Sequence, residues 1–244
     1  MRVIEKETLI GKRIAKLHAP EKASGQTRYV HDLDLPGQLH GALLRSTRLH
    51  ARIKRIDVTR ARALPGVHAV LTAADVPYQR PLGVGKDQLP LKGDKVRSLR
   101  DEIAAVAADS AAIAAVALSL IEVEYEDLPP LPDPAAALRP GAPVIHDEKL
   151  PSPAAHEALK AGEPGDAEAH RHNVAMTFDY AQGDVAAGEA ESDVVVDDWF
   201  RLHYVTHCCM GVSGVIAEFD PSGNLTLHSN TQVPFLHKRE FAEI

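Results

Sequence analysis

The chain has 244 residues, of which 45% are hydrophobic and 25% charged, and its formal net charge at pH 7 is -7. This composition is that of a folded globular protein, and the length corresponds to one large domain or two ordinary ones. A nucleic-acid binder would usually show a basic stripe, and none appears in this acidic sequence. The segment Arg45–Arg62, where basic residues are densest, favours a strand with a solvated basic face over a weak phosphate-steering surface.

The sequence predicts no targeting or membrane segment. Residues 1–6 lack the apolar stretch of a signal peptide, and no run approaches the roughly 18 apolar residues of a membrane span. The cysteines, Cys208 and Cys209, are adjacent, and neighbouring side chains of a strand point to opposite faces, so the two are poorly placed for a disulfide. We therefore expect a cytoplasmic protein.

The first part of the chain predicts an extended arm followed by short strands and turns. Pro20 is unsuited to a helix interior, so residues 1–19 are expected to be extended. Thr59 is expected to cap a short helix that ends before Pro65 and Gly66. Strands are expected at residues 27–30, 39–45, 51–58 and 67–71. A turn is expected at residues 32–37, and a turn or a single helical turn at residues 72–77. Residues 78–94 are expected to form an exposed loop.

The alanine-rich segment 102–120 allows one long helix or a strand followed by a helix. We favour the second, because Asp109 and Ser110 offer an N-cap in its middle. A strand over residues 103–108 would then precede a helix over residues 110–120. Residues 121–126 alternate strictly and predict a half-buried strand, which a proline-stiffened connector follows.

The second part of the chain begins with residues 141–173, which have the composition of a linker and include a possible short helix at 154–161. Gly183 and Asp184 are expected to cap a helix that runs to Ala190. Residues 220–224 have the composition of a hairpin turn. Strands are expected at residues 174–180, 193–202, 215–219 and 225–229, and a further exposed strand near Phe235.

Short motifs follow one another along nearly the whole chain in a fixed order. In its first half they are Gly11–Arg13, Lys22–Tyr29, Asp32–Gly37, Arg45–Ser46, His50–Ile53, Leu64–Val70, Thr72–Pro77, Ile121–Pro129 and Val144–His146. In its second half they are Asp193–Phe200, His207–Met210, Ile216–Asp220 and Ser229–Pro234. In these motifs the chain resembles the molybdenum-carrying subunit of the xanthine dehydrogenase/aldehyde oxidase family.

The resemblance implies an α+β fold: a small α/β hammerhead domain, then the beginning of a mixed α/β molybdopterin-binding domain. The implied parts are an N-terminal arm, the hammerhead, a linker and the N-terminal part of the molybdopterin-binding domain, at residues 1–19, 20–132, 133–173 and 174–244. The chain departs from the family between Arg45 and His50, where a proline and a histidine are missing. Gly211 stands where the family usually has a glutamate, which weakens any substrate-pocket role there.

Gln232 is the residue that the resemblance assigns to the cofactor. In the family, a glutamine in this Asn-Thr-Gln context donates a hydrogen bond to an oxo ligand of molybdenum. An amide suits that role because it is an uncharged donor that orients a metal-oxo group without changing its charge. Without the family context, Gln232 would be a loop glutamine that satisfies backbone groups.

No residue of the chain is assigned as a catalytic residue or as a metal ligand. His203 and His207 have zinc-like spacing, but in a strand residues four apart lie about 13 Å apart, which is too far for one ion. We expect core packing for the cysteines, and a substrate-channel position or a structural hydrogen bond for His207. Two adjacent cysteines cannot hold an iron–sulfur cluster. His50 and His146 are expected at inter-domain contacts.

The family's later Gly-Gly-Phe-Gly loop and its catalytic glutamate, the general base, do not occur in this sequence. We therefore expect part of a split, multi-subunit molybdenum oxidoreductase that is inactive alone, with a complementary chain sharing the molybdopterin cofactor. Partner subunits would carry [2Fe–2S] clusters and FAD. The substrate would be aromatic, heterocyclic, an aldehyde or an acyl thioester. The alternatives are a non-catalytic scaffold or assembly subunit and a truncated product.

Overall fold

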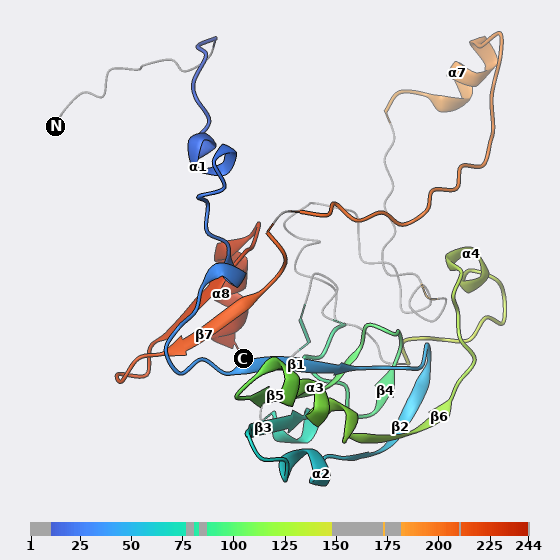
Figure 1. Cartoon of the computed structure of the whole chain (residues 1–244). Helices are drawn as coiled ribbons and strands as arrows, with labels where there is room; N and C mark the ends of the chain where they lie inside the picture. The colour runs from blue at the N-terminus through green and yellow to red at the C-terminus, as the bar shows by residue number, and fades with distance from the viewer. Residues whose placement is uncertain are drawn as a thin grey trace. The chain divides into compact units, whose positions relative to one another are not determined.

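The computed structural model describes residues 11–76, 81–82, 87–147, 173, 182–209 and 211–243. Its contacts divide the chain into two units. Figure 1 labels the helices and strands along the chain. One unit joins Met1–Pro36 to Arg201–Pro234, and the other joins Gly37–Phe200 to Phe235–Ile244. The expected helix at 154–161 and the expected strand at 174–180 lie outside the described residues.

The larger unit contains a three-stranded antiparallel sheet with β5 (Glu102–Ala108) at its centre. β5 pairs on one side with β1 (His40–Arg45) and on the other with β3 (Val67–Thr72). β5 is made almost wholly of small and β-branched residues, and its backbone is paired on both edges. The three strands confirm the strand predictions for these segments.

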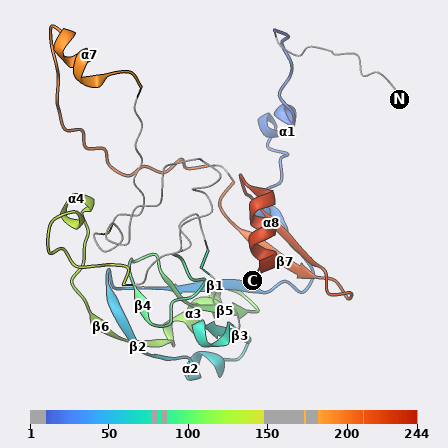
Figure 2. The same ribbon diagram turned by 180° about the vertical axis from the view of Figure 1, so that it is seen from behind.

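Helix α3 (Ala111–Ser119) packs against β5 and β1, as both views of the ribbon show (Figures 1 and 2). Its N-cap is Ser110, whose hydroxyl accepts a hydrogen bond from the backbone N–H of Ile113 at 3.2 Å. The helix therefore begins where the sequence places the break in the alanine-rich segment, and the prediction of a strand followed by a helix is confirmed.

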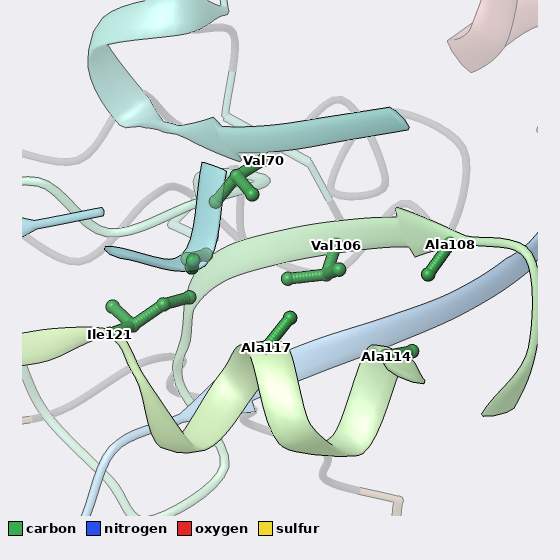
Figure 3. Close-up of a cluster of buried hydrophobic side chains, with 8 residues drawn as sticks. Val70, Val106, Ala108, Ala114, Ala117 and Ile121 are labelled. Carbon is green, nitrogen blue, oxygen red and sulfur yellow. The ribbon is translucent and has the colours of Figure 1, made fainter. Parts of the chain in front are cut away.

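Small side chains form the core between α3 and the sheet. Ala114 and Ala117 of the helix point toward Val106 and Ala108 of β5 (Figure 3). All four are buried, together with Val70, Ala104 and Ile121 in the same apolar cluster. Alanines on both surfaces let the helix axis approach the sheet closely, so a larger residue at either position would overfill the contact.

A second antiparallel sheet places β2 (Ala51–Asp57) between β4 (Lys95–Val96) and β6 (Glu122–Asp127). On the exposed face, the basic side chains of β2 pair with acidic side chains of β6, with Arg55 lying 3.4 Å from Glu124 and Lys54 paired with Glu126. This confirms the solvated basic face. Exposed pairs of this kind contribute little to stability individually.

Two short helices differ from the expectations for the first part of the chain. α1 (Ala19–Ala23) contains Pro20, which is tolerated because it lies in the first turn, where backbone N–H groups lack helical acceptors. The expected strand at residues 27–30 is wrong, since a 3-10 turn, η1 (Val30–Asp32), forms there. The carboxylate of Asp32 accepts a hydrogen bond from the backbone N–H of Tyr29 at 2.8 Å and bends the chain.

The neighbouring helical turns follow local hydrogen bonds. α2 (Thr59–Arg62) confirms the expected short helix, but Thr59 is its first residue and does not cap it. The carboxylate of Asp57 instead accepts the N–H of Thr59 at 2.9 Å. η2 (Ala73–Asp75) confirms the helical turn after β3. In the described part of the segment expected to be an exposed loop, Leu91 and Lys92 are buried, so that expectation is wrong for them.

Short helices follow in the second part of the chain. Asp133 caps α4 (Pro134–Ala137), and Asp184 caps α7 (Val185–Glu191), as expected for the latter. The expected strand near Phe235 is wrong, because α8 (Pro234–Glu243) forms there. The expected strand at residues 193–202 is also wrong: the segment is assigned no strand and is exposed. A strand needs a paired neighbour to supply its ladder hydrogen bonds, and none is found among the described residues.

The smaller unit contains the predicted hairpin, in which β7 (Val215–Phe219) pairs antiparallel with β8 (Leu225–Ser229). Asp220 closes the turn: its carboxylate accepts the backbone N–H groups of Ser222 and Asn224, each at 2.8 Å. Hydrogen bonds from Asn224 lower the pKa of Asp220 below its ordinary value. The turn chemistry that the sequence predicts is therefore confirmed.

Candidate functional site

The candidate site is built around the open end of the β7–β8 hairpin, where Asn230 follows β8. The side-chain amide of Asn230 donates to the carbonyl oxygens of Gly211 (3.4 Å) and Val212 (3.2 Å). Its side-chain oxygen accepts the backbone N–H of Gly214 at 3.1 Å. Asn230 therefore fastens the segment that enters β7 to the end of β8, beyond the last residue pair of the ladder, Val215 with Ser229.

A contact from the N-terminal segment reaches the same loop. A Cβ atom at Gly211 would lie 2.6 Å from Cδ1 and 3.0 Å from Cε1 of Tyr29, whose ring stacks on His31 at 6.1 Å between centroids. Gly211 is therefore required for space and not for backbone conformation. Gly214, three residues on, lies beside Val30 at 3.6 Å by the same measure.

Gln232 lies just beyond this contact, in the connection between β8 and α8. Its side chain is exposed. No hydrogen bond joins its amide to any residue in the described part of the chain, although the neighbouring Thr231 hydroxyl accepts the N–H of Val233 at 3.1 Å. An exposed amide is what the predicted hydrogen bond to a metal-oxo group would require.

His207, Cys208 and Cys209 are exposed and belong to a segment without assigned strand. The expectation that the cysteines pack in the core is wrong, and Cys208 has a left-handed backbone with φ of 45°. No hydrogen bond or ion pair links His207 to Gln232 among the described residues. Within the same residues, no three His, Cys, Asp or Glu side chains are grouped so that they could hold a metal ion.

The two histidines expected at inter-domain contacts both lie in the larger unit. His50 is buried, and its Nδ1 lies 2.7 Å from the carbonyl oxygen of Pro129, while Nε2 is buried without a partner in the described structure. Burial lowers the pKa of His146 below its ordinary value, and the Arg97 guanidinium lowers it further. His146 is therefore held as a neutral imidazole at neutral pH.

Comparisons with known proteins match both parts of the chain. Residues 24–129 match the family model described as "Aldehyde oxidase and xanthine dehydrogenase, a/b hammerhead domain". Residues 167–244 match the model of a "Molybdopterin cofactor-binding domain". The chain belongs to the xanthine dehydrogenase/aldehyde oxidase family. The predicted α+β fold class, a hammerhead followed by molybdopterin-binding sequence, is confirmed.

Relatives in this family are much longer than the chain. It is 38% identical to the carbon monoxide dehydrogenase large chain of Afipia carboxidovorans, and the match covers 86% of this chain and 26% of that one. It is 32% identical to the nicotinate dehydrogenase large molybdopterin subunit of Eubacterium barkeri, over 96% of this chain and 50% of that subunit. The chain therefore spans a quarter to a half of these large subunits of molybdenum enzymes.

Solved structures of the family superpose on most of this chain. A Cu,Mo-CO dehydrogenase in its carbon monoxide reduced state superposes with a TM-score of 0.74 at 34% identity, covering 94% of this chain and 28% of that chain. Quinoline 2-oxidoreductase from Pseudomonas putida 86 gives a TM-score of 0.67 at 29% identity, over 96% and 28% of the two chains. In the described residues, no helix is long and apolar enough to cross a membrane.

Sequence reasoning missed two residues of the candidate site. Asn230 lies inside the motif that singles out Gln232, and an asparagine directly after a strand is a signal for a capping contact. Tyr29 lies in a motif of the first half of the chain, and its partner Gly211 lies in the second half. No local pattern connects them, because the contact depends on the fold.

Proposed function

We propose that this chain forms the hammerhead and the first part of the cofactor site of a molybdenum-dependent oxidoreductase, and that a second chain supplies the rest of that site. The domain limits at residues 20–132 and 174–244 are part of the proposal. The family and the molybdopterin-binding sequence support the cofactor. The share of the relatives that the chain spans supports the need for further large-subunit sequence, including the Gly-Gly-Phe-Gly loop and the catalytic glutamate.

The observation that carries the proposal is the exposure of large apolar side chains after α7. Trp199, Leu202 and Tyr204 are 86%, 91% and 98% exposed, and others in the same run share this exposure: Val194, Val195, Val196, Phe200 and Val205. Burying apolar surface stabilises by about 25 cal/mol per Å². A soluble monomer rarely leaves so many such residues uncovered, so another polypeptide surface is expected to cover them.

The relatives support a multi-chain enzyme. The nicotinate dehydrogenase relative is named a large molybdopterin subunit, and this chain spans 50% of it. By the same relationship, [2Fe–2S] clusters and FAD would lie on partner subunits and carry electrons to or from the molybdenum centre. The substrate would be an aromatic, heterocyclic, aldehyde or acyl-thioester compound that reacts at a carbon next to a heteroatom.

Gln232 would be the residue of this chain that touches the cofactor. The molybdenum cofactor supplies the redox chemistry at the substrate carbon when it is bound. The Gln232 amide would donate a hydrogen bond to an oxo group and so fix its orientation without adding charge. His207 would lie along the substrate channel. In this proposal the family's catalytic glutamate, the general base, would be carried by the partner chain.

The experiment is purification of the tagged chain from its native source, with identification of each co-purifying polypeptide by mass spectrometry. The proposal expects one partner that carries the Gly-Gly-Phe-Gly loop and the late catalytic glutamate, together with an iron–sulfur polypeptide. Recovery of the tagged chain as a soluble monomer without such a partner would contradict it.

A non-catalytic scaffold or assembly subunit is the second candidate. Gly211 favours it, because the ring of Tyr29 occupies the space that any side chain at residue 211 would enter, including the glutamate that the family resemblance implies there. The two candidates differ in what co-purifies. A scaffold would be recovered with a complete molybdenum subunit that has its own hammerhead, whereas the split enzyme would be recovered with a chain that lacks one.

A further inference from the structure

The loop that carries Gln232 is hydrogen-bonded to the Gly211–Gly214 segment, and that segment in turn contacts Tyr29. Asn230 makes three hydrogen bonds to the Gly211–Gly214 segment, of 3.4, 3.2 and 3.1 Å, and uses both the donor and the acceptor group of its amide. An aspartate would keep the acceptor and lose the donor. An alanine would lose both, and the segment before β7 would no longer be fastened to β8.

Gly211 also contacts Tyr29, which lies in the N-terminal part of the chain. The Tyr29 ring lies where a Cβ at residue 211 would be, at 2.6 Å, so ring and glycine fit together with no spare space. Tyr29 is itself held in place, because its N–H donates to Asp32 at 2.8 Å and Arg28 donates to the Asp32 carbonyl oxygen at 2.8 Å. These hydrogen bonds hold the backbone of Tyr29, and its ring stacks on His31 at 6.1 Å between centroids.

We propose that Tyr29, Gly211 and Asn230 form a lock that sets the position of the Gln232 side chain, so that Tyr29 and Asn230 are positioning residues for the cofactor site. Gln232 is two residues beyond Asn230, and the connection from β8 to α8 contains only residues 230–233. So short a connection leaves few free torsions once Asn230 is fixed. This inference rests on the proposed function for the role of Gln232, but the lock itself is a property of the chain.

The test compares the native complex containing wild-type chain, Asn230→Ala, Asn230→Asp, Gly211→Ala and the pair Tyr29→Ala/Gly211→Ala. Amide hydrogen exchange is followed in the peptides that cover residues 211–214 and 229–233. The Mo(V) electron paramagnetic resonance signal is recorded on the same samples. Asn224→Ala, at the far end of the hairpin, removes an asparagine with its own hydrogen bonds and is the matched control.

The lock predicts that Asn230→Ala and Gly211→Ala each speed exchange about five- to tenfold in both peptides. Both substitutions should also shift the Mo(V) signal. The exchange rate of Asn230→Asp should lie between those of the wild type and Asn230→Ala. Adding Tyr29→Ala to Gly211→Ala should add little, because both changes break one contact. Asn224→Ala should leave both peptides and the signal unchanged.

Faster exchange only in the mutated peptide would overturn the lock. So would exchange in the pair Tyr29→Ala/Gly211→Ala that is much faster than in Gly211→Ala alone. Faster exchange in both peptides with an unchanged Mo(V) signal would overturn the positioning of Gln232. If the wild-type complex holds no molybdenum, the proposed function fails. The exchange data then still decide whether Tyr29, Gly211 and Asn230 hold the 229–233 connection.

Discussion

Lys95 donates a hydrogen bond from Nζ to the carboxylate of Asp147, 52 residues farther along the chain, at 2.9 Å. The same ammonium group donates to the carbonyl oxygen of Ile145 at 3.0 Å, and the Lys95 side chain is only 3% exposed. Arg97 adds a further hydrogen bond to the Ile145 carbonyl oxygen at 3.2 Å. The segment that leaves the hammerhead is thus fastened back to β4.

Replacing Lys95 by methionine should release this segment. The loss of charge-assisted hydrogen bonds from a buried ammonium group should lower the free energy of unfolding by about 1–3 kcal/mol. It should also open the chain near Ile145 to limited proteolysis. Lys54→Met is the matched control, because Lys54 is exposed and its pair with Glu126 should contribute less than about 1 kcal/mol. Equal effects of the two substitutions would contradict this account.

Asp75 should make stability depend on pH on the acid side. Its carboxylate accepts the backbone N–H and the hydroxyl of Thr72, each at 2.8 Å, and pairs with Arg62 at 2.9 Å. These contacts, the Thr72 N–H first, lower the pKa of Asp75. Because the folded state holds the ionised form, the stabilisation is present above the unfolded pKa of about 3.9 and is lost as pH falls through the lower folded value.

Urea unfolding between pH 7 and pH 2.5 measures this effect. Asp75→Asn should have a smaller loss of stability on acidification than the wild-type protein, and should be less stable than it at pH 7. Thr72→Val, which removes the hydroxyl donor, should fall between the two. An Asp75→Asn variant with the same acid dependence as wild type would show that other carboxyl groups account for it.

Gly66 should not tolerate a side chain. Its backbone has φ of +84°, and an added Cβ would lie 2.8 Å from Cδ1 of Ile113 on α3. Gly66→Ala should lower the free energy of unfolding by about 2–4 kcal/mol, from the left-handed backbone and the clash together. Gly41→Ala is the control, because nothing lies within 4 Å of its added Cβ, and it should change stability by less than about 1 kcal/mol. Similar thermal shifts for both variants would contradict the prediction.

The fluorescence of Trp199 should show whether a partner covers the exposed apolar residues between 194 and 205. Trp199 is the single tryptophan of the chain and is 86% exposed. In the native complex its emission should lie at shorter wavelength than in the separated chain, because a partner surface removes water from the indole ring. The difference spectrum between the wild-type complex and a Trp199→Phe complex isolates this signal from the partner's own tryptophans. Emission of a solvent-exposed indole in the complex would contradict the expected interface.

The hammerhead elements were predictable because local signals agree with the tertiary contacts. Ser110 caps α3 in the middle of an alanine-rich segment, and the alternation of residues 121–126 matches β6. The sequence prediction failed where a local hydrogen bond outweighed strand propensity, or where a segment has no strand to pair with among the described residues. Asp32 bends residues 30–32 into a helical turn, and residues 193–202 lack a strand partner in the described structure, so β propensity alone does not produce a strand.

The candidate site was predictable only in part. Gln232 came from its motif, and its role at the cofactor stays a prediction. Asn230 lies in the same motif, but its hydrogen bonds form only in the folded hairpin. Tyr29 lies far from Gly211 in the sequence, so their contact also depends on the fold. Expecting the cysteines in the core was wrong, because the segment that carries them does not pair as a strand.

The most direct test of the central claim is the molybdenum content of the complex purified through a tag on this chain. Molybdenum is measured by elemental analysis, and the pterin by fluorescence of its oxidised form, on the same sample as the amount of tagged chain. We expect close to one molybdenum and one pterin for each tagged chain. A stable complex with less than about a tenth of that amount, from cells whose other molybdenum enzymes are loaded, would contradict a role for this chain in the cofactor site.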